Sequence, residues 1–147
     1  MKLNQALKQK NRLAGDLVRQ QQILQRENAR RSDSVSKVDR AKVWENILAI
    51  SDKLGELKAK IAVANVGIYS KLERMAELKS RIAYVTGLHK REGEEITFEG
   101  LQREKVSYTW SSEINQERAD ALVAQLEAQI AQLQDEVDEY NATHDIG

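Results

Sequence analysis

The sequence of 147 residues contains no cysteine and no proline, and only 5% of its residues are aromatic. Without cysteine, the chain has no disulfide framework, no thiolate zinc site and no thiol nucleophile. The lack of proline and the few glycines favour long helices. With 31% charged residues, the chain has little material for a thick globular core. Thin helical packing therefore suits it better than a compact globule.

Long apolar runs are also absent. The longest nearly apolar stretch, Ile61 to Tyr69, has nine residues and includes Asn65 and Gly67, whereas a membrane-spanning helix needs about 20. The first residues lack the apolar segment of a signal peptide. We therefore expect a soluble, cytoplasmic protein with no membrane span.

The chain has no net charge, because 23 basic and 23 acidic residues cancel, but the two signs are unevenly distributed. Residues 1–42 carry eleven basic and four acidic side chains, whereas residues 112–147 carry one basic and nine acidic side chains. A basic arm is compatible with nucleic-acid binding, but the acidic arm is the nearer polyanion. We expect the two arms to pair, and whether they do so within one chain or between chains is left open.

The strongest pattern is a stripe of thirteen positions, spaced four and three residues apart, of which twelve are apolar and one is Lys71. A strict 3.5-residue spacing held over this length predicts a helix packed in a coiled coil. We expect one helix over about residues 37–87. The stripe consists of Val43, Ile47, Ile50, Leu54, Leu57, Ile61, Ala64, Ile68, Lys71, Met75, Leu78, Ile82 and Val85.

A shorter helix is predicted on each side, over about residues 2–30 and 112–141. Ser36 with Asp39 fits a capping box that opens the long helix, and Ser111 or Ser112 fits the cap of the last one. Short links give antiparallel neighbours, and the helix lengths then bring both termini together near the middle of the long helix. The outer stripes are Leu3, Leu7, Ala14, Leu17 and Leu24, and Ala119, Val123, Leu126, Ile130, Leu133, Val137 and Tyr140.

Two positions of the long helix have alternative interpretations. Lys71 either specifies the register of its stripe or keeps its ammonium in solvent while Leu72 fills the space. Gly67, which follows a run of small residues, indicates a close helix contact, a ligand-sized gap or a glycine that the helix merely tolerates.

After Gly87 the period changes from 3.5 to 2, which predicts a β-hairpin over about residues 95–110 with a loop of about five residues. A two-stranded ribbon is marginal alone in water. We therefore expect its apolar residues to share one face and to contact a second copy of the chain in a homo-oligomer. These interaction residues are Ile96, Phe98, Val106, Tyr108 and Trp110.

No catalytic, cofactor-binding or metal site is predicted. His89 and His144 are the only histidines, and neither belongs to a metal-binding motif or a catalytic triad. No glycine-rich phosphate loop is present. Basic residues near the hairpin aromatics suit single-stranded nucleic acid, but five glutamates are interleaved with them. We expect a protein that is not an enzyme.

Several short motifs lie along the chain: Met1-Lys2-Leu3 with Ala6-Leu7 and Arg12-Leu13, the central Ala64-Asn65, the segment 103–108 that leads to Ser111, and a closing helix that ends at Asn141. Together they resemble a family of small bacterial coiled-coil proteins often labelled septicolysin. The resemblance implies a helical hairpin architecture. Its label implies a cytolysin, so a membrane-active toxin is an alternative function.

The sequence thus predicts an all-α fold, an elongated antiparallel coiled coil of three helices with a small β-hairpin at its tip, as a single domain over residues 1–147. The expected function is that of a non-enzymatic assembly or adaptor protein that associates with itself. Another protein partner, the oligomer number and the biological role are left open. Nucleic-acid binding through the basic arm is the alternative.

Overall fold

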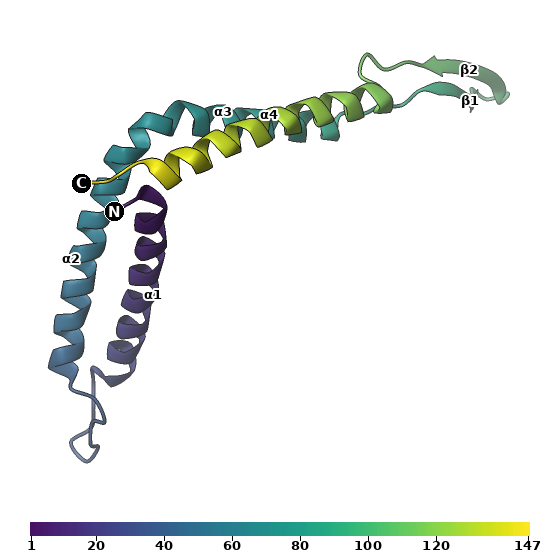
Figure 1. The fold of residues 1–147 in the computed structure, drawn as a ribbon. Coiled ribbons are helices and arrows are strands. Elements are labelled where there is room, and N and C mark those ends of the chain that lie inside the picture. The colour runs from purple at the N-terminus through teal and green to yellow at the C-terminus, as the bar shows by residue number, and fades with distance from the viewer. The chain divides into compact units, whose positions relative to one another are not determined.

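A computed structural model describes residues 1–147, of which 69% lie in helices. The residues pack in two units, Met1–Tyr69 with Asp138–Gly147, and Ser70–Val137. The predicted helical class and the hairpin are confirmed, whereas the coiled-coil geometry and the single domain stay predictions. The elements are α1 (Leu3–Glu27), α2 (Arg40–Asn65), the 3-10 turn η1 (Val66–Ile68), α3 (Tyr69–Gly87), β1 (Gly93–Glu99), β2 (Glu104–Trp110) and α4 (Gln116–Thr143) (Figure 1).

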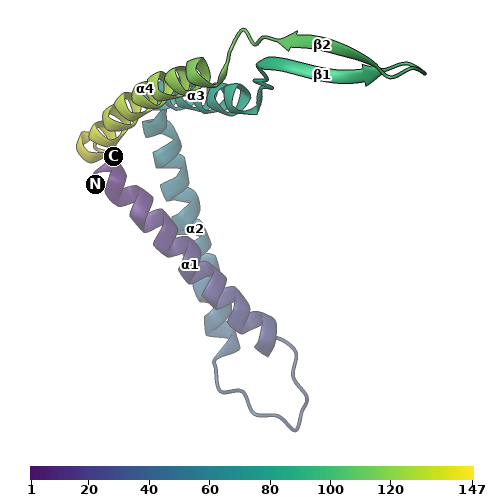
Figure 2. The same cartoon turned by 90° about the vertical axis from the view of Figure 1, so that its right-hand side faces the viewer.

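The long apolar stripe faces inward. Ten of its thirteen side chains are buried, and the other three, Ile50, Lys71 and Ile82, are partly buried. In the first unit α1 lies antiparallel to α2, as Figures 1 and 2 show. Because burying a large apolar side chain contributes about 1.5–3 kcal/mol, this stripe is the main source of stability for helices that have no thicker core.

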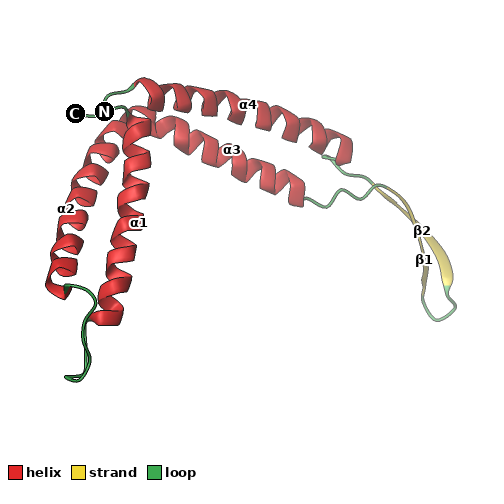
Figure 3. Cartoon of the chain, turned by 60° about the horizontal axis from the view of Figure 1, so that its bottom comes forward, coloured by secondary structure: helices red, strands yellow, loops and turns green.

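In the second unit α3 lies antiparallel beside residues 116–137 of α4 (Figure 3). Lys71, the polar member of the stripe, is half exposed and pairs across the two helices with Glu136, its Nζ lying 2.5 Å from Oε2. The ion pair therefore accompanies an otherwise apolar contact. The buried residues of these helices are Met75, Leu78, Val85, Ala119, Leu126 and Val137.

The two chain ends meet beside α2, as the helix lengths predict. The N–H of Leu3 donates to the carbonyl of His144, and the N–H of Ile146 donates to the carbonyl of Met1, both at 2.9 Å. The ammonium of Lys2 lies 2.6 Å from the carboxylate of Asp145. One pair between the basic and the acidic arm thus forms within the chain. Ile146 is buried in a cluster with Leu3, Ala6, Leu57, Ile61 and Ala64.

The predicted single helix over 37–87 is wrong at one point, because η1 interrupts it. Tyr140 packs so closely on Gly67 that an added Cβ would lie 2.9 Å from the ring atom Cζ. The Tyr140 hydroxyl donates to the carbonyl of Ala64 at 2.9 Å, a group that a regular helix would offer to the N–H of Ile68. The close contact at Gly67 is therefore confirmed, and the competing hydrogen bond accounts for the local 3-10 turn.

The cap predicted for the long helix lies elsewhere. α2 begins after Asp39, whose carboxylate accepts the N–H of Lys42 at 3.1 Å. Ser36 instead bonds to both backbone groups of Val38. The link between the first two helices is longer than predicted for two reasons. α2 begins later than predicted, at Arg40, and α1 ends earlier, at Glu27.

The last helix also begins later than predicted. Asn115 precedes it and accepts the N–H of Arg118 at 2.9 Å through its side-chain oxygen. Ser112 does not cap the helix, because its hydroxyl donates to the carbonyl of Arg91 at 2.8 Å, and Ser111 lies outside the helix as well. The serine that the local sequence predicts as the helix cap is therefore engaged with the segment before β1 instead.

Gly67→Ala should lower the stability, although alanine favours a helix over glycine by about 1 kcal/mol. The new methyl group would meet the ring of Tyr140, and overpacking of this kind costs about 1–3 kcal/mol. Gly55→Ala is the matched control in α2, because a Cβ there meets nothing within 4 Å; it should raise stability by about 1 kcal/mol. Urea unfolding measures both changes, and shifts of the same sign would contradict the contact.

Asp145→Asn should lower the melting temperature near neutral pH and have no effect in acid. The hydrogen bond and charge of Lys2 lower the pKa of Asp145. Such a carboxyl stabilises the fold above its unfolded pKa, about 3.9, and loses that effect as the pH falls through its folded pKa. Thermal melts over this range should therefore converge for the two proteins. Asp52→Asn, an exposed α2 residue without an ion pair, is the control, and an equal shift there would refute the assignment.

Candidate functional site on the β-hairpin

The hairpin turns through the four residues Gly100–Arg103. Gly100 has a φ of 78°, in the left-handed region that glycine adopts without steric cost. The N–H of Arg103 donates to the carbonyl of Gly100 at 3.2 Å and closes the turn. Glu104 already belongs to β2, so the loop is one residue shorter than the five residues that the sequence predicts.

The shorter loop changes which side chains share a face. Tyr108 lies opposite Glu95, and Ile96 lies opposite Ser107. Opposed residues point to the same face and successive residues alternate, so the five predicted interaction residues do not share one face, and that prediction is wrong. A change of one residue in register exchanges the faces of a whole strand. The Trp110 face carries Val106, Tyr108 and Trp110, and the Phe98 face carries Ile96 and Phe98.

On the Trp110 face the polar atoms of the aromatic residues are satisfied. Trp110 Nε1 donates to Glu95 at 2.6 Å, and the Tyr108 hydroxyl lies 3.0 Å and 3.2 Å from the two carboxylate oxygens of Glu99. The hydrogen bond with Glu99 raises the pKa of Tyr108. The Arg91 guanidinium lies 4.8 Å from the centre of a Trp110 ring. The rings are oriented, yet each aromatic residue is still more than two-fifths exposed.

The Phe98 face has no such support. Phe98 is 66% exposed and Ile96 is 49% exposed, and they lie opposite Lys105 and Ser107. No residue of either strand is buried. In Figures 1 and 2 the ribbon extends beyond the ends of α3 and α4. The helices therefore do not cover the hairpin.

The basic residues around the hairpin do not form one patch. Lys90 donates to the carbonyls of Thr86 and Leu88 at 2.9 Å, and Arg91 lies over Trp110 at the base of the ribbon. Arg103 and Lys105 lie at the loop end, seven strand residues away. The structure thus separates the cations that the nucleic-acid alternative would bring together.

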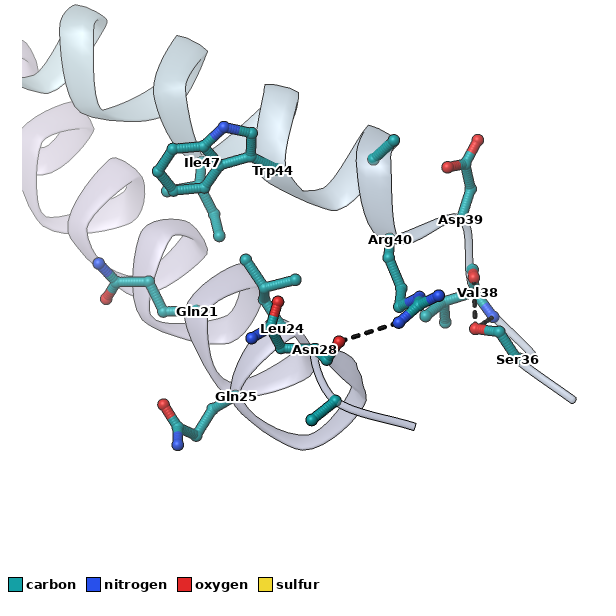
Figure 4. A pocket seen from close by; sticks show the side chains of 12 residues that line it. Gln21, Leu24, Gln25, Asn28, Ser36, Val38, Asp39, Arg40, Trp44 and Ile47 are labelled. Carbon is teal, nitrogen blue, oxygen red and sulfur yellow. Dashed lines mark hydrogen bonds between the residues drawn. The ribbon is translucent and has the colours of Figure 1, made fainter. Parts of the chain in front are cut away.

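A groove that sequence reasoning missed lies between the end of α1 and the start of α2 (Figure 4). Trp44 is 51% exposed along its wall, beside Ile47. Across its end, Arg40 donates to the carbonyl of Asn28 at 2.9 Å. The available signal was the tryptophan itself, which directly follows the stripe residue Val43.

Metal-binding clusters and membrane-spanning helices are both absent. No three His, Asp or Glu side chains gather closely enough to hold a metal ion. His144 stacks on Tyr140, with ring centres 4.5 Å apart, so it belongs to the packing of the chain end. None of the helices combines the length and the apolar character that crossing a membrane requires.

Comparisons of the chain with protein-family models, with curated proteins and with solved structures find no match. The resemblance to the septicolysin proteins and the architecture that it implies therefore stay predictions. The hairpin is the candidate site because of its own geometry.

Proposed function

We propose that the protein is a non-enzymatic assembly or adaptor module that associates with itself through the hairpin. The observation that carries this proposal is that no strand residue is buried, although the ribbon holds several large apolar side chains. Among them Ile96, Phe98, Tyr108 and Trp110 are 44–66% exposed. Clustered exposed apolar groups mark interaction sites, and burying each large one contributes about 1.5–3 kcal/mol.

The weak internal stability of a two-stranded ribbon supports the same proposal. Such a ribbon is marginal alone in water. Its side-chain hydrogen bonds and the Arg91–Glu95 ion pair are exposed, and exposed polar pairs add little net stability because water competes for the same groups. A partner that covers the ribbon would therefore stabilise it as well as bind it.

Nucleic-acid binding through the basic arm, residues 1–42, is the competing function. Its side chains partly pair within the arm, as in Arg31 with Asp33 and Arg30 with Glu27. Binding to DNA or RNA that weakens steeply with salt would favour this competitor, because phosphate contacts release counterions. Dye release from liposomes would favour the membrane-active toxin instead.

Phe98→Ser and Trp110→Ser, made together in one variant, should lower the mass measured by light scattering. Each change removes apolar area from one face of the hairpin, and the double change removes it from both. Leu101→Ser is the matched control, because Leu101 is fully exposed on the loop and belongs to neither face. Circular dichroism should show unchanged helix content. A wild-type protein that is monomeric at micromolar concentration, or a mass unaffected by the double change, would contradict the proposal.

A further inference from the structure

Both outer edges of the ribbon are unpaired, because the sheet contains β1 and β2 alone. In an edge strand, alternate residues point their N–H and carbonyl groups away from the sheet, where another strand can pair with them. Pairing of one strand with the same strand of a second copy forms a closed twofold contact. Such a contact occupies one strand edge in each chain, so it joins two copies and does not extend to a third.

The charges of the two edges differ. β1 carries three carboxylates and no basic residue among its seven residues, whereas the charges of Glu104 and Lys105 in β2 cancel. Pairing β1 with a second β1 would bring two sets of three carboxylates together, and charged residues are a common protection of edge strands. The charge of β1 therefore disfavours that edge, and β2 is the edge open to a second copy.

We propose that β2 pairs antiparallel with β2 of a second copy, about a twofold axis at Ser107. This inference rests on the proposed self-association and names the surface that it uses. Ser107 is the middle residue of β2, so this register pairs all seven residues of the strand. The result is a four-stranded sheet shared by two chains.

The register is favourable on the Trp110 face of the shared sheet. Val106 lies opposite the partner's Tyr108, and a branched residue beside an aromatic one is a stabilising cross-strand pair. Trp110 lies opposite the partner's Glu104, so no two carboxylates face each other across the new contact. The twofold axis is perpendicular to the sheet, so the apolar residues of both Trp110 faces form one continuous row.

On the opposite face of the shared sheet, one pair of residues makes the contact sensitive to charge. Lys105 lies opposite the partner's Thr109, and each pair occurs twice because of the symmetry. Antiparallel pairing also places the loop of each hairpin beside the base of the other. The α3–α4 pairs of the two chains then leave from opposite ends of the shared sheet.

Single cysteines test the register, since the chain has none of its own. Ser107→Cys lies opposite its copy, where Cβ atoms are about 4.5–5.5 Å apart, close to disulfide range. Thr109→Cys is the matched control two residues along on the same face; it is displaced by four residues, about 13 Å, from its copy. Mild oxidation should convert the first variant to a covalent dimer and leave the second as single chains. Equal cross-linking of both, or of neither, would overturn the register.

A charge exchange tests the pairing without covalent chemistry. Thr109→Lys places a lysine opposite the partner's Lys105, so the mass should fall towards the 16.7 kDa of one chain. Within its own hairpin Thr109 lies opposite Glu94, so the same change does not weaken the ribbon. Adding Lys105→Glu should restore the wild-type mass, because opposite charges then meet.

The outcomes separate this inference from the proposed function. A wild-type protein that is monomeric would contradict self-association and the β2 contact together. An oligomeric wild type whose mass does not change with Thr109→Lys would contradict the β2 contact alone. A fall in mass that Lys105→Glu does not reverse would also contradict it, because the effect would then lie outside this pair.

Discussion

The structure depends on one constraint, that each helix of a thin pair can bury only one of its sides. The apolar stripe of α2 and α3 supplies that side along the whole length, and α1 and α4 cover it in turn. Other sides stay in solvent, as the 75% exposure of Val63 and the 69% exposure of Tyr84 show. Because the helices direct their apolar stripes at each other, those stripes are not available to cover the hairpin. The exposure of the hairpin thus follows from how the helices pair.

The spacing of the stripe made the helical part predictable. Thirteen positions in one register leave little room for another period, so the existence of the helices and their inward side chains followed from sequence. The meeting of the termini followed from helix lengths alone. By contrast, the exact start of α2 depended on a choice between Ser36 and Asp39, two residues that cap helices almost equally well. Sequence locates such a boundary only to within a few residues.

The features that sequence could not give depend on contacts between distant residues or on a single residue of loop length. The 3-10 turn at Gly67 exists where Tyr140, far along the chain, bonds to the carbonyl of Ala64. The faces of the hairpin depend on whether its loop has four or five residues, since side chains alternate with a period of two. Both strands were predictable, but their relative register was not, and for that reason all five site residues were wrongly assigned to one face.

The division of the site residues has a consequence for any assembly built on the hairpin. Pairing through the edge of β2 joins the Trp110 faces of two chains but leaves Ile96 and Phe98 on β1, away from the new contact. Those two residues are buried only if another surface packs on their face, as sheets do when they stack about 10 Å apart. The edge and the Phe98 face are therefore independent contacts. An assembly that used both in every chain would contain more than two copies, because a twofold edge contact occupies only one partner.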